Sequence, residues 1–205
     1  MQMSGETKFF LGVILVTIAI LTGAVFFFAK APVEVPMETL VPKDAWATGS
    51  ATPKLTLVEF SDFECPACGS AHPIVKKVVE KYKDKLRFVL RHFPLDQHTN
   101  AKFAANVAEA AGAQGKFWEM GDKLFQNQTD LSETTYERLA KELNLNMDEF
   151  TKAMKENTYN EKIQRDINDG IAVGINSTPT FFLNGKKLNL FQFTDLDTEI
   201  QKALQ

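Results

Sequence analysis

The chain has 205 residues, of which 44% are hydrophobic and 24% are charged, so its composition is that of a globular protein. Its 23 Lys and Arg against 26 Asp and Glu leave a net charge of −3, so the chain lacks the excess of positive charge that is typical of nucleic-acid-binding proteins. The two cysteines exclude a scaffold held by several disulfides and a zinc site made of cysteine alone.

The N-terminal part contains a long apolar segment. Phe9–Ala29 is a run without charge, and at about 1.5 Å per residue in a helix it reaches across the roughly 30 Å hydrocarbon core of a bilayer. Ala29-Lys30-Ala31 has the small-x-small form of a signal-peptidase site, but signal peptides carry shorter apolar runs, of about 7–15 residues. We therefore predict an uncleaved anchor or signal segment over 1–30, with the rest of the chain outside the cytoplasm.

The next segment is expected to be a linker. Residues 31–53 show no hydrophobic periodicity and contain Pro32, Pro36, Pro42 and Pro53, which favour a semi-extended chain. The folded unit is then expected to span 54–205.

The first part of that unit has the pattern of a βαβ unit. Leu55–Phe60 is typical of a buried strand, and Leu86–His92 is typical of a second strand. The apolar stripe that follows Cys65-Pro66-Ala67-Cys68 predicts a helix between them. Because the connection is a single helical crossover, the two strands should be parallel.

The rest of the unit is expected to be a helical block followed by ββα. Helical patterns fill about 99–176. Thr180–Leu183 and Lys186–Leu190 are predicted as a hairpin around the turn at Asn184-Gly185. An amphipathic helix over Thr194–Leu204 closes the chain. The predicted fold class is therefore α/β, ordered βαβ … ββα, with a helical insertion.

The cysteine pair lies where a strand hands over to a helix. Pro66 suits the first helical turn, which leaves Cys65 facing the free N–H groups of the helix N-terminus. These groups lower the pKa of a thiol, whereas Cys68, one turn later, points toward the body of the domain. An exposed attacking sulfur and a protected resolving sulfur are what thiol–disulfide exchange requires.

Two other interpretations of the cysteine pair stay open. A plain structural disulfide would stabilise little, because it closes a loop of only two residues. A metal site would use Cys65, Cys68 and His72, as in a copper-type metal chaperone. We expect His72, His92 and His98 each to be structural.

Glu59 is the second informative residue. It shares a strand face with Leu55 and Leu57, which puts a carboxylate among apolar neighbours, and burial should raise its pKa. A carboxyl group of raised pKa near Cys68 can exchange a proton with that thiol. The alternative is a glutamate at the strand edge that reaches solvent.

Several motifs occur in a fixed order along the unit. They are Phe60-Ser61-Asp62-Phe63-Glu64-Cys65-Pro66-Ala67-Cys68, His72-Pro73, Phe93-Pro94-Leu95, Gln114-Gly115-Lys116-Phe117-Trp118 and Ser177-Thr178-Pro179-Thr180-Phe181-Phe182. Together they resemble the DsbA-like branch of the thioredoxin superfamily, whose members are exported thiol–disulfide oxidoreductases. The resemblance covers nearly all of 54–205.

This resemblance implies roles for particular residues. It makes Cys65 the nucleophile, Cys68 the resolving cysteine and Glu59 the buried acid. Pro179 matches the cis-proline loop where substrate backbone docks, and Thr178, Pro66 and Ala67 are the other substrate-binding residues that it implies. The dipeptide between the cysteines is Pro-Ala, not the Pro-His of the founding member, in which the histidine favours the thiolate.

The expected function is dithiol oxidation of exported proteins by an enzyme tethered to the membrane through residues 9–29. A disulfide isomerase or a reductase of a maturation pathway is the alternative. The redox-active pair Cys65–Cys68 would serve in place of a cofactor or metal. The resemblance implies partners with free thiols and a quinone-linked membrane protein that reoxidises the pair.

Overall fold

The structure is a computed structural model that describes residues 5–28 and 34–205. The chain divides into two compact units, and helix α1 (Gly5–Phe28) belongs to the first. Among the described residues, no helix is both long enough and apolar enough to cross a membrane, so the anchor over Phe9–Ala29 stays a prediction. Ala29, Lys30, Ala31 and Pro32, which carry the end of that anchor, the cleavage-site pattern and the start of the linker, lie outside the described residues.

The second unit, Val35–Gln205, is built on one mixed sheet. Its strands lie in the order β1-β3-β2-β4-β5 and are β1 (Trp46–Gly49), β2 (Leu55–Ser61), β3 (Leu86–His92), β4 (Thr180–Leu183) and β5 (Lys186–Lys187). The predicted parallel pairing of β2 with β3 is confirmed, and the other pairs are antiparallel.

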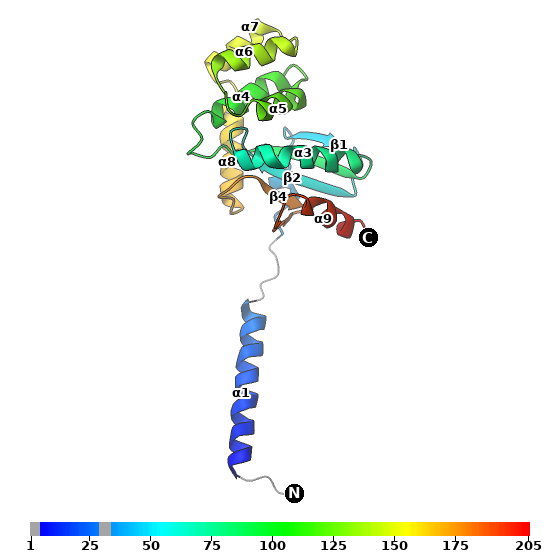
Figure 1. Cartoon of the computed structure of the whole chain (residues 1–205), viewed down its shortest axis with the longest axis vertical. Coiled ribbons are helices and arrows are strands. Elements are labelled where there is room, and N and C mark those ends of the chain that lie inside the picture. Colours follow the sequence, from blue (N-terminus) through cyan, green and yellow to red (C-terminus); the bar gives the residue numbers. More distant parts are fainter. Residues whose placement is uncertain (1–4, 29–33) are drawn as a thin grey trace. The chain divides into compact units, whose positions relative to one another are not determined.

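The helices from α3 (Pro66–Lys81) onward follow the predicted order, whereas α2 (Met37–Leu40) was not predicted. The remaining helices of this unit are α4 (Ala101–Gly112), α5 (Phe117–Gln126), α6 (Glu133–Glu142), α7 (Met147–Glu156), α8 (Asn160–Ala172) and α9 (Asp195–Ala203). Helices α4 to α8 form the insertion between β3 and β4, and α4 to α7 stack beyond α3 at one end of the unit (Figure 1).

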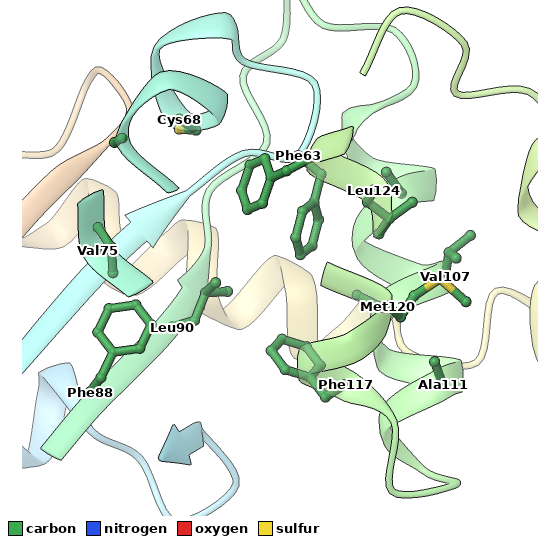
Figure 2. Packing of buried hydrophobic residues seen from close by; sticks show 14 of the residues in the cluster. Phe63, Cys68, Val75, Phe88, Leu90, Val107, Ala111, Phe117, Met120 and Leu124 are labelled. Carbon is green, nitrogen blue, oxygen red and sulfur yellow. The ribbon is translucent and has the colours of Figure 1, made fainter. Parts of the chain in front are cut away.

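The alternation of side chains along β2 builds a core on each face of the sheet. Leu55 and Leu57 belong to the larger core, which α3, α9 and the insertion cover. Figure 2 shows this core running from Cys68 and Val75 to Ala111 in the insertion. Val58 and Phe60 point to the opposite face and pack in a second core with Leu40 of α2.

The linker prediction is wrong for most of residues 31–53, because this segment folds into the unit from Val35 onward. Leu40 is fully buried, and β1 extends the sheet beside β3. The Trp46 ring stacks on Phe117 with ring centroids 4.5 Å apart. The Trp46 ring also lies against Gly112 of α4, where an added Cβ would be 2.3 Å from the ring. The prolines suggested an extended linker, and β1, with four residues, is too short to show the alternation of a strand in the sequence.

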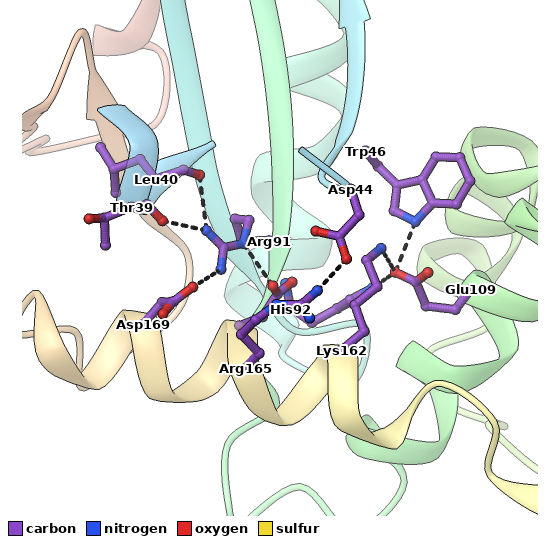
Figure 3. A network of polar contacts seen from close by, with 11 residues as sticks. Thr39, Leu40, Asp44, Trp46, Arg91, His92, Glu109, Lys162, Arg165 and Asp169 are labelled. Carbon is purple, nitrogen blue, oxygen red and sulfur yellow. Dashed lines mark hydrogen bonds and ion pairs between the residues drawn. The ribbon is translucent and has the colours of Figure 1, made fainter. Parts of the chain in front are cut away.

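Two buried ionic clusters join the insertion to the sheet (Figure 3). The fully buried Arg91 of β3 donates to Asp166 at 2.9 Å and to Asp169 at 2.6 Å, both on α8, and also to the carbonyl oxygens of Thr39 and Leu40. Each nitrogen of the guanidinium thereby meets at least one acceptor, as a buried charge requires.

The second cluster centres on Glu109 of α4. Its Oε1 accepts from Trp46 Nε1 at 2.8 Å, lies 2.8 Å from His92 Nε2 and pairs with Lys162 of α8. These contacts hold the pKa of the buried Glu109 carboxyl below its ordinary value, against the effect of its desolvation. The cluster fixes β1, β3, α4 and α8 relative to one another.

Candidate active site

The two cysteines lie at the start of α3, close to the end of β2. Cys65 is the N-cap residue, and Pro66 occupies the first helical turn, where its missing N–H is no loss. Both cysteines are free thiols; Cys65 is 6% exposed and Cys68 is fully buried. Pro66 itself is exposed and Ala67 is half-buried, so the tip of the motif faces solvent.

The two thiols differ sharply in acidity. A hydrogen bond from the Cys68 thiol is the largest influence that lowers the pKa of Cys65, and backbone N–H groups of Cys68 and Ala67 add to it, bringing this pKa to about 5. Burial raises the pKa of Cys68 far above its ordinary value, and the Glu59 charge raises it further. Cys65 is therefore the thiolate at neutral pH and Cys68 keeps its proton.

The loop before β4 lies directly against Cys65. The Thr178–Pro179 peptide bond is cis, and the Thr178 carbonyl oxygen lies 3.5 Å from Cys65 Sγ, where it accepts a hydrogen bond from the protonated thiol. Thr178 is 8% exposed, and its hydroxyl has no hydrogen-bond partner within the described part of the chain. Pro179 is half-buried beside it. The sequence motifs at Cys65 and Thr178, 113 positions apart, thus meet in one site.

Glu59 lies on β2 beneath the cysteines. It is only 3% exposed, so the alternative of a strand-edge glutamate that reaches solvent is wrong. Its Oε1 accepts from the Ser61 hydroxyl at 2.7 Å. Burial raises the pKa of Glu59 to about 7, although the Ser61 bond opposes this rise. The group therefore exchanges a proton near neutral pH, which fits an acid–base role.

Glu59 also borders a cavity of about 420 Å³ between α3, α5 and the sheet. The apolar part of its lining includes Phe88, Leu90 and Phe117, which Figure 2 shows around a common space. The polar part includes His72 and Asp122. The carboxyl group thus lies among apolar side chains that account for its desolvation.

Comparison with known proteins supports the same fold. A family model described as Thioredoxin matches residues 42–202, which is most of the chain. The chain belongs to the thioredoxin family. A thioredoxin-like oxidoreductase from Silicibacter pomeroyi shares the fold, at 26% identity and a TM-score of 0.71 over 83% of this chain and 96% of that one.

Two further solved structures share the fold. DsbA2 from Pseudomonas aeruginosa is 26% identical, with a TM-score of 0.64 over 80% of this chain and 94% of that one. BdbD from Bacillus subtilis has a TM-score of 0.71 over 85% and 96% of the two chains, and at 19% identity it shows the shared fold alone.

Curated relatives resemble this thioredoxin-family chain over part of their length. The Na⁺/H⁺ antiporter NhaA 3 of Salinispora tropica is 37% identical over 155 residues, which are 74% of this chain and 24% of that protein. NhaA 1 of Mycobacterium sp. strain KMS is 39% identical over 142 residues, 68% of this chain and 23% of that protein. The chain spans about a quarter of the length of these relatives.

Two polar residues that support the thioredoxin-family site were not identified from the sequence. Asp62 is buried, and its Oδ1 accepts from the Glu64 N–H at 2.8 Å, which shapes the turn before Cys65. Gln128 Nε2 donates to the carbonyl oxygens of Phe63 at 2.8 Å and Cys65 at 2.9 Å. An aspartate at a strand-to-helix turn is a known signal. The contact of Gln128 depends on tertiary structure alone.

The metal alternative required Cys65, Cys68 and His72 to converge. His72 Nε2 instead lies 2.7 Å from Asp122 Oδ1, and burial lowers the pKa of His72. Within residues 5–28 and 34–205, no three His, Cys, Asp or Glu side chains are grouped so that they can hold a metal ion.

Proposed function

We propose that this chain is a thiol–disulfide oxidoreductase that oxidises dithiols in exported proteins. The observation that carries the proposal is the asymmetry of the cysteine pair: the pKa of Cys65 falls to about 5 while that of the buried Cys68 rises. A stable Cys65 thiolate favours the reduced pair, so the oxidised pair accepts electrons readily. Structures of DsbA-like proteins with the same fold support this activity.

The reaction follows from these positions. A substrate thiolate attacks Cys65 Sγ of the Cys65–Cys68 disulfide, and Cys68 Sγ leaves with the electron pair of the broken bond. A second substrate thiolate then attacks the substrate sulfur of the mixed disulfide and releases Cys65 as a thiolate. The substrate gains a disulfide and loses two electrons, which the cysteine pair receives.

Glu59 supplies the proton that the first step requires. Cys68 is a poor leaving group because its pKa is high, and Glu59 has a pKa of about 7, so it holds a transferable proton near neutral pH. In the reverse direction Glu59 takes the proton from Cys68 when that thiol attacks a mixed disulfide. We therefore assign Glu59 as the proton carrier for Cys68.

The substrate contacts are proposed at the exposed rim of the site. Pro66 and Ala67 lie at the solvent-facing tip, and Pro179 borders Cys65 on the other side. The unpartnered Thr178 hydroxyl suits a hydrogen bond to an extended peptide backbone. Contacts to the peptide backbone do not depend on the side chains of the substrate, and an oxidant of many proteins requires this tolerance.

Membrane tethering outside the cytoplasm is a further part of the proposal. It rests on the uncharged run Phe9–Ala29 and on apolar side chains of α1, such as Phe9 and Ile20, that are exposed. An oxidising compartment suits a redox-active disulfide. The partners we propose are exported proteins with free thiols and a quinone-linked membrane protein that reoxidises the pair. The transport activity of the antiporter relatives is not part of this proposal.

Trapping of mixed disulfides tests the activity. Cys68→Ser should accumulate a covalent adduct with a synthetic dithiol peptide supplied in its oxidised form, when the peptide thiol released by the attack is alkylated, because no Cys68 thiol remains to resolve the adduct. Cys65→Ser, the matched control, should accumulate at least roughly tenfold less, because the high pKa of Cys68 leaves little thiolate. Equal trapping by the two variants would overturn the assignment of Cys65 as nucleophile. Equilibration of the pair with glutathione separates an oxidase, with a strongly oxidising potential, from a reductase with a thioredoxin-like one.

A further inference from the structure

A histidine outside the cysteine motif lies next to the turn that carries the nucleophile. His98 Nδ1 lies 2.6 Å from Asp62 Oδ2, and the carbonyl oxygen of the same Asp62 accepts from the Cys65 N–H at 3.2 Å. Asp62 Oδ2 also accepts from the Leu95 N–H at 2.9 Å, and the Leu95 carbonyl oxygen accepts from the His98 N–H at 2.9 Å. One buried carboxylate thus ties the imidazole to the start of the active-site helix.

The acidic residues of this turn create an electrostatic problem. Asp62 and Glu64 place two carboxylates within three positions of Cys65, where negative charge opposes formation of a thiolate. The Glu64 carboxylate accepts hydrogen bonds from the N–H and the side-chain amide of Asn100, which are uncharged donors, so its negative charge is not neutralised by them. A cation beside the turn would offset this charge.

His98 meets that requirement. Asp62, Cys65 and Glu64 all raise the pKa of His98 above its ordinary value, although partial burial opposes them. Its side chain is 18% exposed, so its charge is only partly screened by water. At the acidic pH at which Cys65 ionises, the imidazole is a cation.

The geometry points to His98 as an electrostatic positioning residue, held by Asp62, that stabilises the Cys65 thiolate and binds a proton more tightly when the cysteine pair is reduced. This inference rests on the proposed function and extends it. In this chain the cation comes from the loop after β3, and no histidine stands between the cysteines. The expectation that His98 is only structural is replaced by this role.

The size of the effect is bounded by the stronger influences on Cys65. A hydrogen bond from the Cys68 thiol lowers the pKa of Cys65 most, and backbone N–H groups of Cys68 and Ala67 add to it, so the further lowering that we infer for His98 must be smaller. We expect roughly half a pKa unit, which is about threefold in the thiolate equilibrium. Linkage requires ionisation of Cys65 to raise the pKa of His98 by the same amount, and reduction of the pair is what produces the Cys65 thiolate at neutral pH.

The experiment measures both sides of this linkage on the full chain in detergent. NMR titration of the labelled histidines should give a His98 pKa roughly half a unit higher in the reduced than in the oxidised protein. His98→Asn keeps a donor for Asp62 but removes the charge, and it should raise the pKa of Cys65, followed by thiolate absorbance, by the same amount. His72→Gln is the matched control, because His72 also pairs with an aspartate, Asp122, and should leave the pKa of Cys65 unchanged.

Each outcome decides the inference separately from the proposed function. A His98 pKa that is equal in the two redox forms overturns it, and this readout needs no variant to fold. An unchanged Cys65 pKa in folded His98→Asn, or an equal change in His72→Gln, also overturns it. Neither measurement uses a substrate, so a chain that fails to oxidise dithiols but shows the linkage would reject the function and keep the role of His98.

Discussion

Among single residues, Glu59 combines a role in the proposed chemistry with a cost in stability. Its pKa is about 7 in the folded chain against an ordinary 4.5. The folded state therefore binds the extra proton between these values, so the contribution of Glu59 to stability is most favourable below about pH 4.5 and is lost as the pH rises through about 7. The difference corresponds to about 3 kcal/mol, because the side chain is fully buried.

Replacing Glu59 with Gln tests this cost and the proton-carrier role together. Glu59→Gln cannot ionise, so its free energy of unfolding relative to wild type should rise by about 3 kcal/mol between about pH 4 and pH 8. The resolving step should slow near neutral pH, while alkylation of Cys65 stays near the wild-type rate. Denaturant unfolding of the reduced protein and stopped-flow turnover across pH measure the two effects. A stability difference that is constant with pH, with unchanged turnover, would show that Glu59 is a scaffold residue.

How far single residues could be predicted depended on the range of their contacts. The placement of Glu59 in the core follows from the period of β2, because alternate residues of a strand share a face. The pairing of Asp62 with His98 joins positions 36 apart, and no local pattern encodes that distance. Gln128 likewise meets the active-site turn only through the path of the insertion.

At the scale of elements, Arg91 is the contact that joins β3, α2 and α8. Arg91→Met should lower the free energy of unfolding by about 3–5 kcal/mol, because it leaves Asp166 buried without its ionic partner. Arg165→Met is the matched control on α8. Its pair with Asp44 is about half exposed on both sides, so its loss should change stability by less than about 1 kcal/mol. Denaturant unfolding of both variants measures the two changes in free energy. Equal changes would contradict the claim that the buried contacts of Arg91 hold β3, α2 and α8 together.

The elements that the sequence revealed are those with a clear period or a turn signal. β2 and β3 were evident from buried apolar runs, and the β4–β5 hairpin from Asn184-Gly185, where both residues have positive φ. β1 could not be recognised, because its four residues are too short for a period. It exists because the edge of β3 offers a partner and Phe117 offers a surface for Trp46.

For the whole molecule, the boundary of the folded unit has a direct consequence. A chain that begins at Val35 keeps α2, β1 and the buried Leu40, whereas a chain that begins at Lys54 loses all three. The longer chain should unfold cooperatively with its cysteine chemistry intact. The shorter one should be less stable by at least about 3 kcal/mol, since large buried side chains are removed from both cores. Thermal and denaturant unfolding of the two chains test the boundary, and equal stability would restore the linker interpretation.

The central claim is that the Cys65–Cys68 pair passes its disulfide to other proteins. The most direct measurement is a single turnover in which the oxidised full chain, in detergent, meets one equivalent of a reduced dithiol peptide, with both products identified by mass. The account predicts that the peptide loses two hydrogens and the chain gains two, and that Cys65→Ser abolishes the transfer. A peptide that stays reduced while the Cys65–Cys68 disulfide remains intact would contradict the account.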